Sequence, residues 1–130
     1  MIRLATRLML AWVFVHGGLD VLRNPEPRAK VAGPLLDKLH ELAPLLPDDK
    51  IAMVRLNATV HLTAGLLLVF GQLPRFAALA LAASLVPTTL GGHRYWEIAD
   101  PAQRAQQRIH VNKNLAIMGG LLVFAASSDR

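Results

Sequence analysis

The run FAALALAASLVPTTLGG, residues 76–92, contains no charged side chain and shows no polar stripe along one helical face. A helix on the surface of a soluble bundle would carry polar residues at a helical spacing on its outer side. A segment that is apolar all round is typical of lipid, where about 17–25 mostly apolar residues span the hydrocarbon core. The run therefore predicts a membrane-spanning helix.

Three further segments of the 130-residue chain repeat this pattern, although two of them reach the required length only by including charged residues. We expect a single all-α membrane domain over residues 1–130, built as an antiparallel bundle of four transmembrane helices. Hydrophobic residues make up 53% of the chain, which is high for a soluble domain of this size. The expected spanning helices are residues 4–22, 51–70, 76–92 and 109–126.

The long first connection contains an amphipathic segment, residues 31–47, whose leucines recur at a helical spacing. This spacing predicts one or two short amphipathic helices, punctuated by Pro34, Pro44 and Pro47. Such a segment would lie at the membrane interface or cap the bundle. In the third connection, Asp100 followed by Pro101 predicts the N-cap and first residue of the helix that leads into the fourth span.

Charge and residue usage narrow the function classes. The chain has 14 Lys and Arg against 9 Asp and Glu, but these cations lie mostly between apolar runs, and no RNA-binding or zinc-finger spacing occurs. We therefore expect no nucleic-acid partner. The chain has no cysteine, which excludes disulfides and thiol chemistry of its own, so a redox role would need a bound cofactor or a partner. The five histidines lack metal-ligand spacing, and we expect no metal site.

Polar side chains of the apolar segments gather where the first and third spans end and the second and fourth begin. These ends share one membrane face in an antiparallel bundle. Residues spaced four apart share a helix face, and a charge facing lipid costs about 2.5–3.5 kcal/mol on insertion scales, so we expect these groups to point inward. The sequence predicts a pocket lined by His16, Asp20, Arg55, Asn57, His61, His93, Trp96, His110, Lys113 and Asn114.

The charges of this predicted pocket suggest its ligand. Asp20 is the one acid in the set, and we expect it to pair with Arg55 or Lys113. The remaining positive charge and the imidazoles favour an anion or a carbonyl-bearing acceptor such as a quinone. A structural alternative stays open, because Arg55 and Lys113 lie close enough to helix ends to extend to the headgroups, and a membrane histidine can simply bond a neighbouring carbonyl.

Two stretches, RLMLAWVFVHGGLDVLRNP near the start and HRYWEIADPAQRAQQRIHVNKNLAIMGGLLV near the end, resemble the DoxX family of small bacterial four-helix membrane proteins. The second is similar to a family signature of the form H-x-F/Y-W-x-x-x-D-P-x-x-R-x-x-Q-x-x-H-x-x-K-N-L-x-x-x-G-G-L-L. The resemblance implies a multi-pass protein of the bacterial cytoplasmic (inner) membrane. Some relatives are linked to thiosulfate:quinone oxidoreductase, and others to membrane assemblies that handle oxidative or thiol stress.

Three functions follow from these observations. The first is a subunit of a quinone- or sulfur-oxyanion-linked oxidoreductase complex, in which His16 and His61 exchange protons and Lys113 with Asn114 holds the ligand oxygens. The second is a non-enzymatic membrane scaffold or assembly protein. The third, a small transporter, is weakened by a third span with nothing polar at mid-membrane. Whether the chain is itself an enzyme, its orientation, its protein partners and a homo-oligomeric state stay open.

Overall fold

A computed structural model describes residues 1–128, which form α-helices and one short 3-10 helix, with no strand among them. The chain order is α1 (Ile2–Arg23), α2 (Glu26–Leu42), α3 (Lys50–Phe70), α4 (Pro74–Gly92), η1 (Tyr95–Glu97) and α5 (Pro101–Ser127). Four of the helices, α1, α3, α4 and α5, are long and apolar enough to cross a membrane. The all-α fold with four spanning helices is confirmed.

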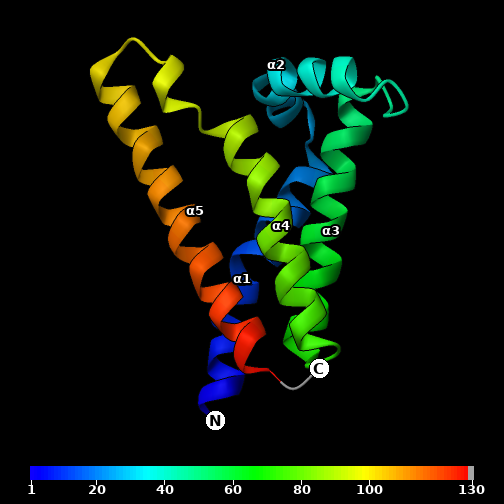
Figure 1. Cartoon of the computed structure of the whole chain (residues 1–130), viewed down its shortest axis with the longest axis vertical. Helices are drawn as coiled ribbons and strands as arrows, with labels where there is room; N and C mark the ends of the chain where they lie inside the picture. Colours follow the sequence, from blue (N-terminus) through cyan, green and yellow to red (C-terminus); the bar gives the residue numbers. More distant parts are fainter. Residues whose placement is uncertain (129–130) are drawn as a thin grey trace.

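Contacts between the spanning helices follow the order α1, α3, α4, α5. Helix α1 packs along α3, α3 packs against α4, and α4 packs against α5, whereas α1 and α5 touch each other only sparsely. Helix α2 lies across the end of the bundle, where it contacts α3 and α4 (Figure 1). The opposite end holds the N-terminus and the end of α5. We call the end covered by α2 the loop end of the bundle.

Local sequence signals explain where the helices begin and end. The Asp100 carboxylate accepts a hydrogen bond of 3.1 Å from the Gln103 amide, and Pro101 opens α5, as the sequence predicts. Gly71 ends α3 in the left-handed conformation, with φ of 70°. Helix α2 differs from expectation, because it starts at Glu26 and continues through Pro34. Contacts of the neighbouring residues with α4, described below, hold this turn in place despite the hydrogen bond that the proline removes.

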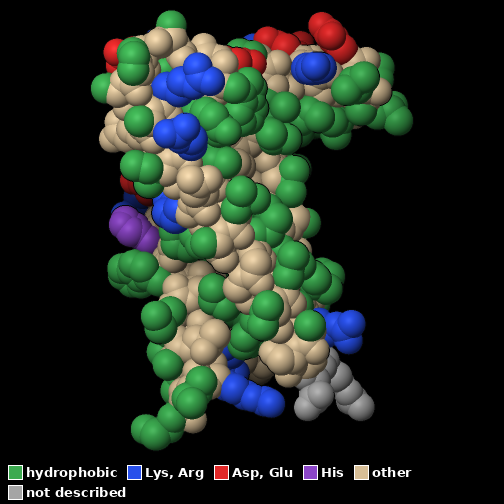
Figure 2. Space-filling view, turned by 60° about the vertical axis from the view of Figure 1, so that its left-hand side comes forward, with side chains coloured by type: hydrophobic (Ala, Val, Ile, Leu, Met, Phe, Trp, Pro, Cys, Tyr) green, Lys and Arg blue, Asp and Glu red, His purple; other side chains and the backbone are tan. Residues whose placement is uncertain are grey.

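The buried core occupies the half of the bundle away from α2. Its members come from the middle of α1, the end of α3, the start of α4 and the end of α5, and the largest fully buried ones include Leu68, Leu81 and Leu121. The outer faces expose large apolar side chains, among them Met9 and Phe70. Figure 2 shows most charged side chains of the visible face toward the two ends, with a mainly hydrophobic band between them. This distribution suits helices that contact lipid.

Two adjacent glycines of α1 provide a test of the α1–α3 contact. A Cβ added at Gly18 would lie 2.9 Å from the backbone oxygen of Ala58, whereas one added at Gly17 would meet nothing within 4 Å. We expect Gly18→Ala to lower the free energy of unfolding in mixed micelles by about 1–3 kcal/mol, because backbone atoms must move apart. Gly17→Ala, the matched control, should leave it unchanged or raise it slightly, since alanine favours the helix. If both variants lower the free energy of unfolding equally, the close contact of Gly18 with Ala58 is contradicted.

Candidate functional site

A cavity of about 610 Å³ fills the loop end of the bundle, next to the core. All five α-helices contribute to its lining. Most of the lining is apolar, including Phe14 and Val21 of α1 and the leucines 35, 36 and 39 of α2. A largely apolar cavity with a few polar groups is the usual form of a small-molecule site. The core therefore supports one half of the bundle, and the other half leaves room for a ligand.

Helix α2 covers this cavity because several contacts hold it on α3 and α4. A Cβ added at Gly91 of α4 would lie 3.3 Å from atoms of both Ala32 and Leu35, so glycine allows α2 to approach α4 closely. The Arg94 guanidinium donates a 3.2 Å hydrogen bond to the backbone oxygen of Val31. At the other end of α2, Asp37 forms a 2.9 Å ion pair with Lys50.

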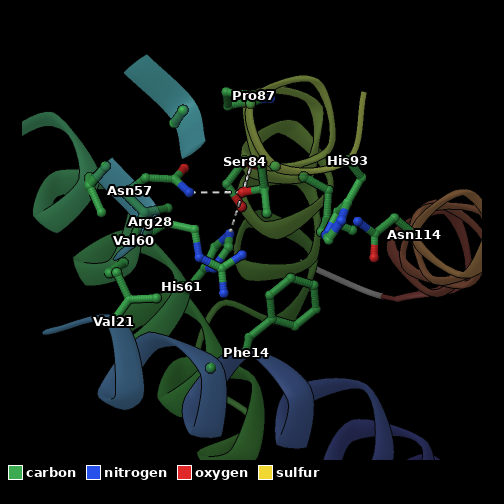
Figure 3. Close-up of a pocket in the computed structure, with 18 of the residues that line it drawn as sticks. Phe14, Val21, Arg28, Asn57, Val60, His61, Ser84, Pro87, His93 and Asn114 are labelled. Atoms are coloured by element: carbon green, nitrogen blue, oxygen red, sulfur yellow. Dashed lines mark hydrogen bonds between the residues drawn. The ribbon is translucent and has the colours of Figure 1, made fainter. Parts of the chain in front are cut away.

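Arg28 extends from α2 into the cavity, beside His61 of α3 (Figure 3). Within residues 1–128 the ion pairs are Asp37–Lys50 and Arg94–Glu97, so Arg28 has no carboxylate partner there. No Asp or Glu of the described residues lines the cavity either. Arg28 as a whole residue is exposed, and its guanidinium, which lines a largely apolar cavity without a carboxylate partner, can bind a ligand that brings negative charge or a strong hydrogen-bond acceptor.

One polar group of the cavity joins α3 to α4. The Thr88 hydroxyl donates to the backbone oxygen of Ser84 at 2.8 Å and accepts from the Asn57 amide at 2.8 Å. Nε2 of His61 lies 3.5 Å from the same hydroxyl, and the His61 ring packs edge-on against Phe14. Because the single hydroxyl proton is already donated, Nε2 of His61 must carry a proton to bond Thr88. These contacts orient the His61 imidazole toward the cavity.

A second polar group joins the end of α4 to α5. Nδ1 of His93 lies 2.6 Å from Oε1 of Gln107, an oxygen that can only accept, so His93 donates through Nδ1. Neutral His93 then keeps Nε2 as a free acceptor. The His93 ring stacks on His110, with ring centroids 4.8 Å apart, and Nζ of Lys113 lies 3.4 Å from Nδ1 of His110. This wall therefore supplies two neighbouring imidazoles and a second cation.

The structure places the predicted site residues in two groups. Those that line the cavity are Asn57, His61, His93, His110, Lys113 and Asn114. Those that do not are His16, Asp20, Arg55 and Trp96, and all four are exposed. His16 packs edge-on against Trp12 on the outer face of α1, and Trp96 packs against Tyr95 in η1.

The expected ion pair of Asp20 with Arg55 or Lys113 is wrong, because no such pair occurs among the described residues. Helix geometry explains the error. Gly18 is the α1 residue in close contact with α3, and Asp20 lies two positions further on, which turns its side chain about 200° away from that contact. Sequence spacing showed that His16 and Asp20 share a face of α1, but not that this face points outward.

Sequence reasoning missed Arg28, Ser84, Thr88 and Gln107. Arg28 follows the first span in RNPEPR, and no sequence spacing connects this stretch with the other cavity residues. Thr88 follows Pro87 in a run that was treated as apolar throughout, although its two threonines were a visible polar signal. Gln107 belongs to the signature near the end of the chain. Only the position of α2 over the bundle reveals that Arg28 can reach the same cavity.

Asn114 should contribute to stability by attaching α5 to α4. It is buried, and its amide donates a 3.0 Å hydrogen bond to Oγ1 of Thr89. We expect Asn114→Ala to lower the free energy of unfolding in mixed micelles by about 0.6–1.7 kcal/mol, the usual range for such bonds between membrane helices. The matched control is Asn112→Ala, which changes an exposed residue of the same helix and should shift this free energy by less than about 0.5 kcal/mol. If Asn114→Ala and Asn112→Ala have the same free energy of unfolding, this hydrogen bond does not stabilise the contact between α4 and α5.

The comparisons with known proteins agree with this architecture. The DoxX family model matches residues 2–94, which include α1 to α4 and His93 but not α5. No curated protein and no solved structure matches the chain at a significant level. The family match covers well over half of the 130 residues, and four helices of the structure have the length and composition of membrane spans. The chain is therefore a membrane protein that belongs to the DoxX family.

Proposed function

We propose that this DoxX-family protein is the membrane subunit of a redox-related complex and that it binds a quinone in the cavity beneath α2. The observation that carries this proposal is Arg28, a cation without a carboxylate partner in a largely apolar cavity. A quinone offers carbonyl oxygens that accept hydrogen bonds from a guanidinium, and its ring suits apolar walls. Arg55, which the sequence placed in this pocket, lies outside the lining.

The apolar lining favours a quinone over a sulfur oxyanion. A small dianion would have to exchange its hydration shell for the leucines of α2, Phe14 and Val21. Such a transfer is costly unless several donors replace the lost water. Arg28 and Lys113 are the cations of the lining, and Lys113 lies on α5, beside His110. A neutral carbonyl ligand needs only one strong donor at a carbonyl oxygen, which the Arg28 guanidinium can provide.

The imidazoles of the cavity suit proton exchange with such a ligand. A quinone supplies a carbonyl–hydroxyl couple that takes up or releases two electrons and two protons. His61 beside Arg28 and the stacked pair His93 and His110 stand on two walls of the cavity. An imidazole can both accept and donate a proton, and Nε2 of His93 is free to accept one. We propose that these residues hold and move the protons.

The proposal also requires a protein partner. Because the chain has no cysteine, it cannot pass electrons through its own thiols, and we propose that a partner in the bacterial cytoplasmic membrane supplies them. There are two alternatives: the protein is a scaffold that binds no ligand, or it binds a sulfur oxyanion in the same cavity. The following experiment distinguishes them.

Replacing Arg28 should weaken quinone binding. We expect Arg28→Ala to raise the Kd for a short-tailed benzoquinone by about 10- to 100-fold, because a hydrogen bond to a charged group contributes about 1.5–3 kcal/mol. The measurement is calorimetric titration of the protein in lipid nanodiscs, with the signal of empty nanodiscs subtracted.

Arg55→Ala is the control for this titration, because it also removes an arginine, but one that lies on α3 outside the cavity lining. Its Kd should equal that of the wild type. Binding of thiosulfate with no quinone binding would point to the oxyanion. If the wild type binds neither, and a co-purifying membrane partner is retained by Arg28→Ala, the scaffold function replaces this proposal.

A further inference from the structure

We propose that the cavity opens sideways into the hydrocarbon core through a gap between α1 and α5 at Gly17, and that the apolar tail of the bound quinone leaves through this gap. The inference rests on the proposed function, since it assumes that the oxygen-bearing head lies beside Arg28. It adds the class of ligand, a long-tailed amphiphile, and the route by which it exchanges with the bilayer.

The packing of the helices leaves this side of the cavity weakly closed. Helix α1 packs along α3 and α5 packs against α4, while α1 and α5 have few contacts with each other. One of these contacts lies toward the core, where a Cβ added at Gly120 would come within 3.6 Å of Leu10. Toward the loop end, α5 moves away from α4 (Figure 1). The few contacts between α1 and α5 leave the walls that they form only weakly joined.

Some residues beside the gap between α1 and α5 both line the cavity and lie on the surface of the protein. Val13 of α1 lines the cavity and is 41% exposed, and Lys113 of α5 lines it and is also exposed. Gly17, one helical turn after Val13 on α1, also lines the cavity, and a Cβ added there would meet nothing within 4 Å. A residue that borders both a cavity and the outside, with open space in front of its Cα, marks an opening.

The opening faces lipid rather than water. Gly17 belongs to the span Ile2–Arg23 and lies six residues before its end, about 9 Å along the helix axis. Helix α2 covers the water-facing end of the cavity, and its leucines form the wall there. Its contact with Gly91 of α4 is so close that a Cβ added at Gly91 would force neighbouring atoms to shift. A tail that passes between α1 and α5 stays in hydrocarbon, so its apolar surface never meets water.

The experiment compares two probes on two glycine variants in nanodiscs. The probes are a benzoquinone with an isoprenoid tail of several units and the same head without a tail. We expect Gly17→Leu to raise the Kd of the long-tailed quinone by about tenfold or more and to leave that of the tail-less quinone unchanged. Gly119→Leu is the matched control, because Gly119 also faces open space on a spanning helix but lies outside this cavity. Both probes should bind it as they bind the wild type.

The outcomes separate the two proposals. If the wild type binds neither probe, the proposed function fails and the inference falls with it. If the wild type binds both and Gly17→Leu binds the long-tailed quinone normally, the gap is not the tail's path, although the function stands. If Gly17→Leu loses both probes equally, the leucine fills the head site and the inference is also overturned. Retained binding of the tail-less quinone shows that the variant is folded.

A second measurement uses the absence of native cysteine. In Gly17→Cys and Gly119→Cys, the introduced thiol is the only one available to a membrane-dissolved maleimide. We expect the long-tailed quinone to slow labelling of Gly17→Cys about tenfold at a concentration ten times its Kd, since a site occupied about nine-tenths of the time is exposed one-tenth of it. Labelling of Gly119→Cys should not change. Equal protection of both positions, or of neither, would contradict the proposed path.

Discussion

The placement of α2 across the end of the bundle is the contact on which the candidate site depends. It closes the cavity with leucines and carries Arg28 into it. Gly91 allows this placement, since a larger residue there would press against Ala32 and Leu35. The hydrogen bond from Arg94 to Val31 and the Asp37–Lys50 ion pair hold α2 at two points. Without this helix, the polar groups that the spanning helices present would be imidazoles, amides, hydroxyls and Lys113.

One half of the bundle contains the buried core, and the other half contains the cavity. The buried leucines and alanines build a core in the half that holds the N-terminus. Toward α2 the helices separate, and polar side chains line the space. Hydrocarbon offers polar groups no water, so each needs a partner inside the protein or in a ligand. Thr88 and Gln107 satisfy several of them, and Arg28 has no carboxylate partner among the described residues.

Sequence spacing grouped Asn57 with His61 on one helix, and His110, Lys113 and Asn114 on another, because residues three or four apart share a helix face. In the structure these five residues line the same cavity. The same rule grouped His16 with Asp20 and gave no information about where that face points. Arg28 was missed because its role depends on a contact between α2 and α4, which are far apart along the chain.

The sequence by itself determined the four spanning helices, the turn signals between them and the scarcity of carboxylates in the apolar segments. These features depend on composition and on local backbone rules, which act within a few residues. Only the tertiary structure decided which helix faces look into the cavity, that α2 covers it, and that α1 and α5 stand apart beside Gly17. Rotation and separation of packed helices depend on contacts such as Gly18 with Ala58, which join distant residues and leave no periodic signal in the sequence.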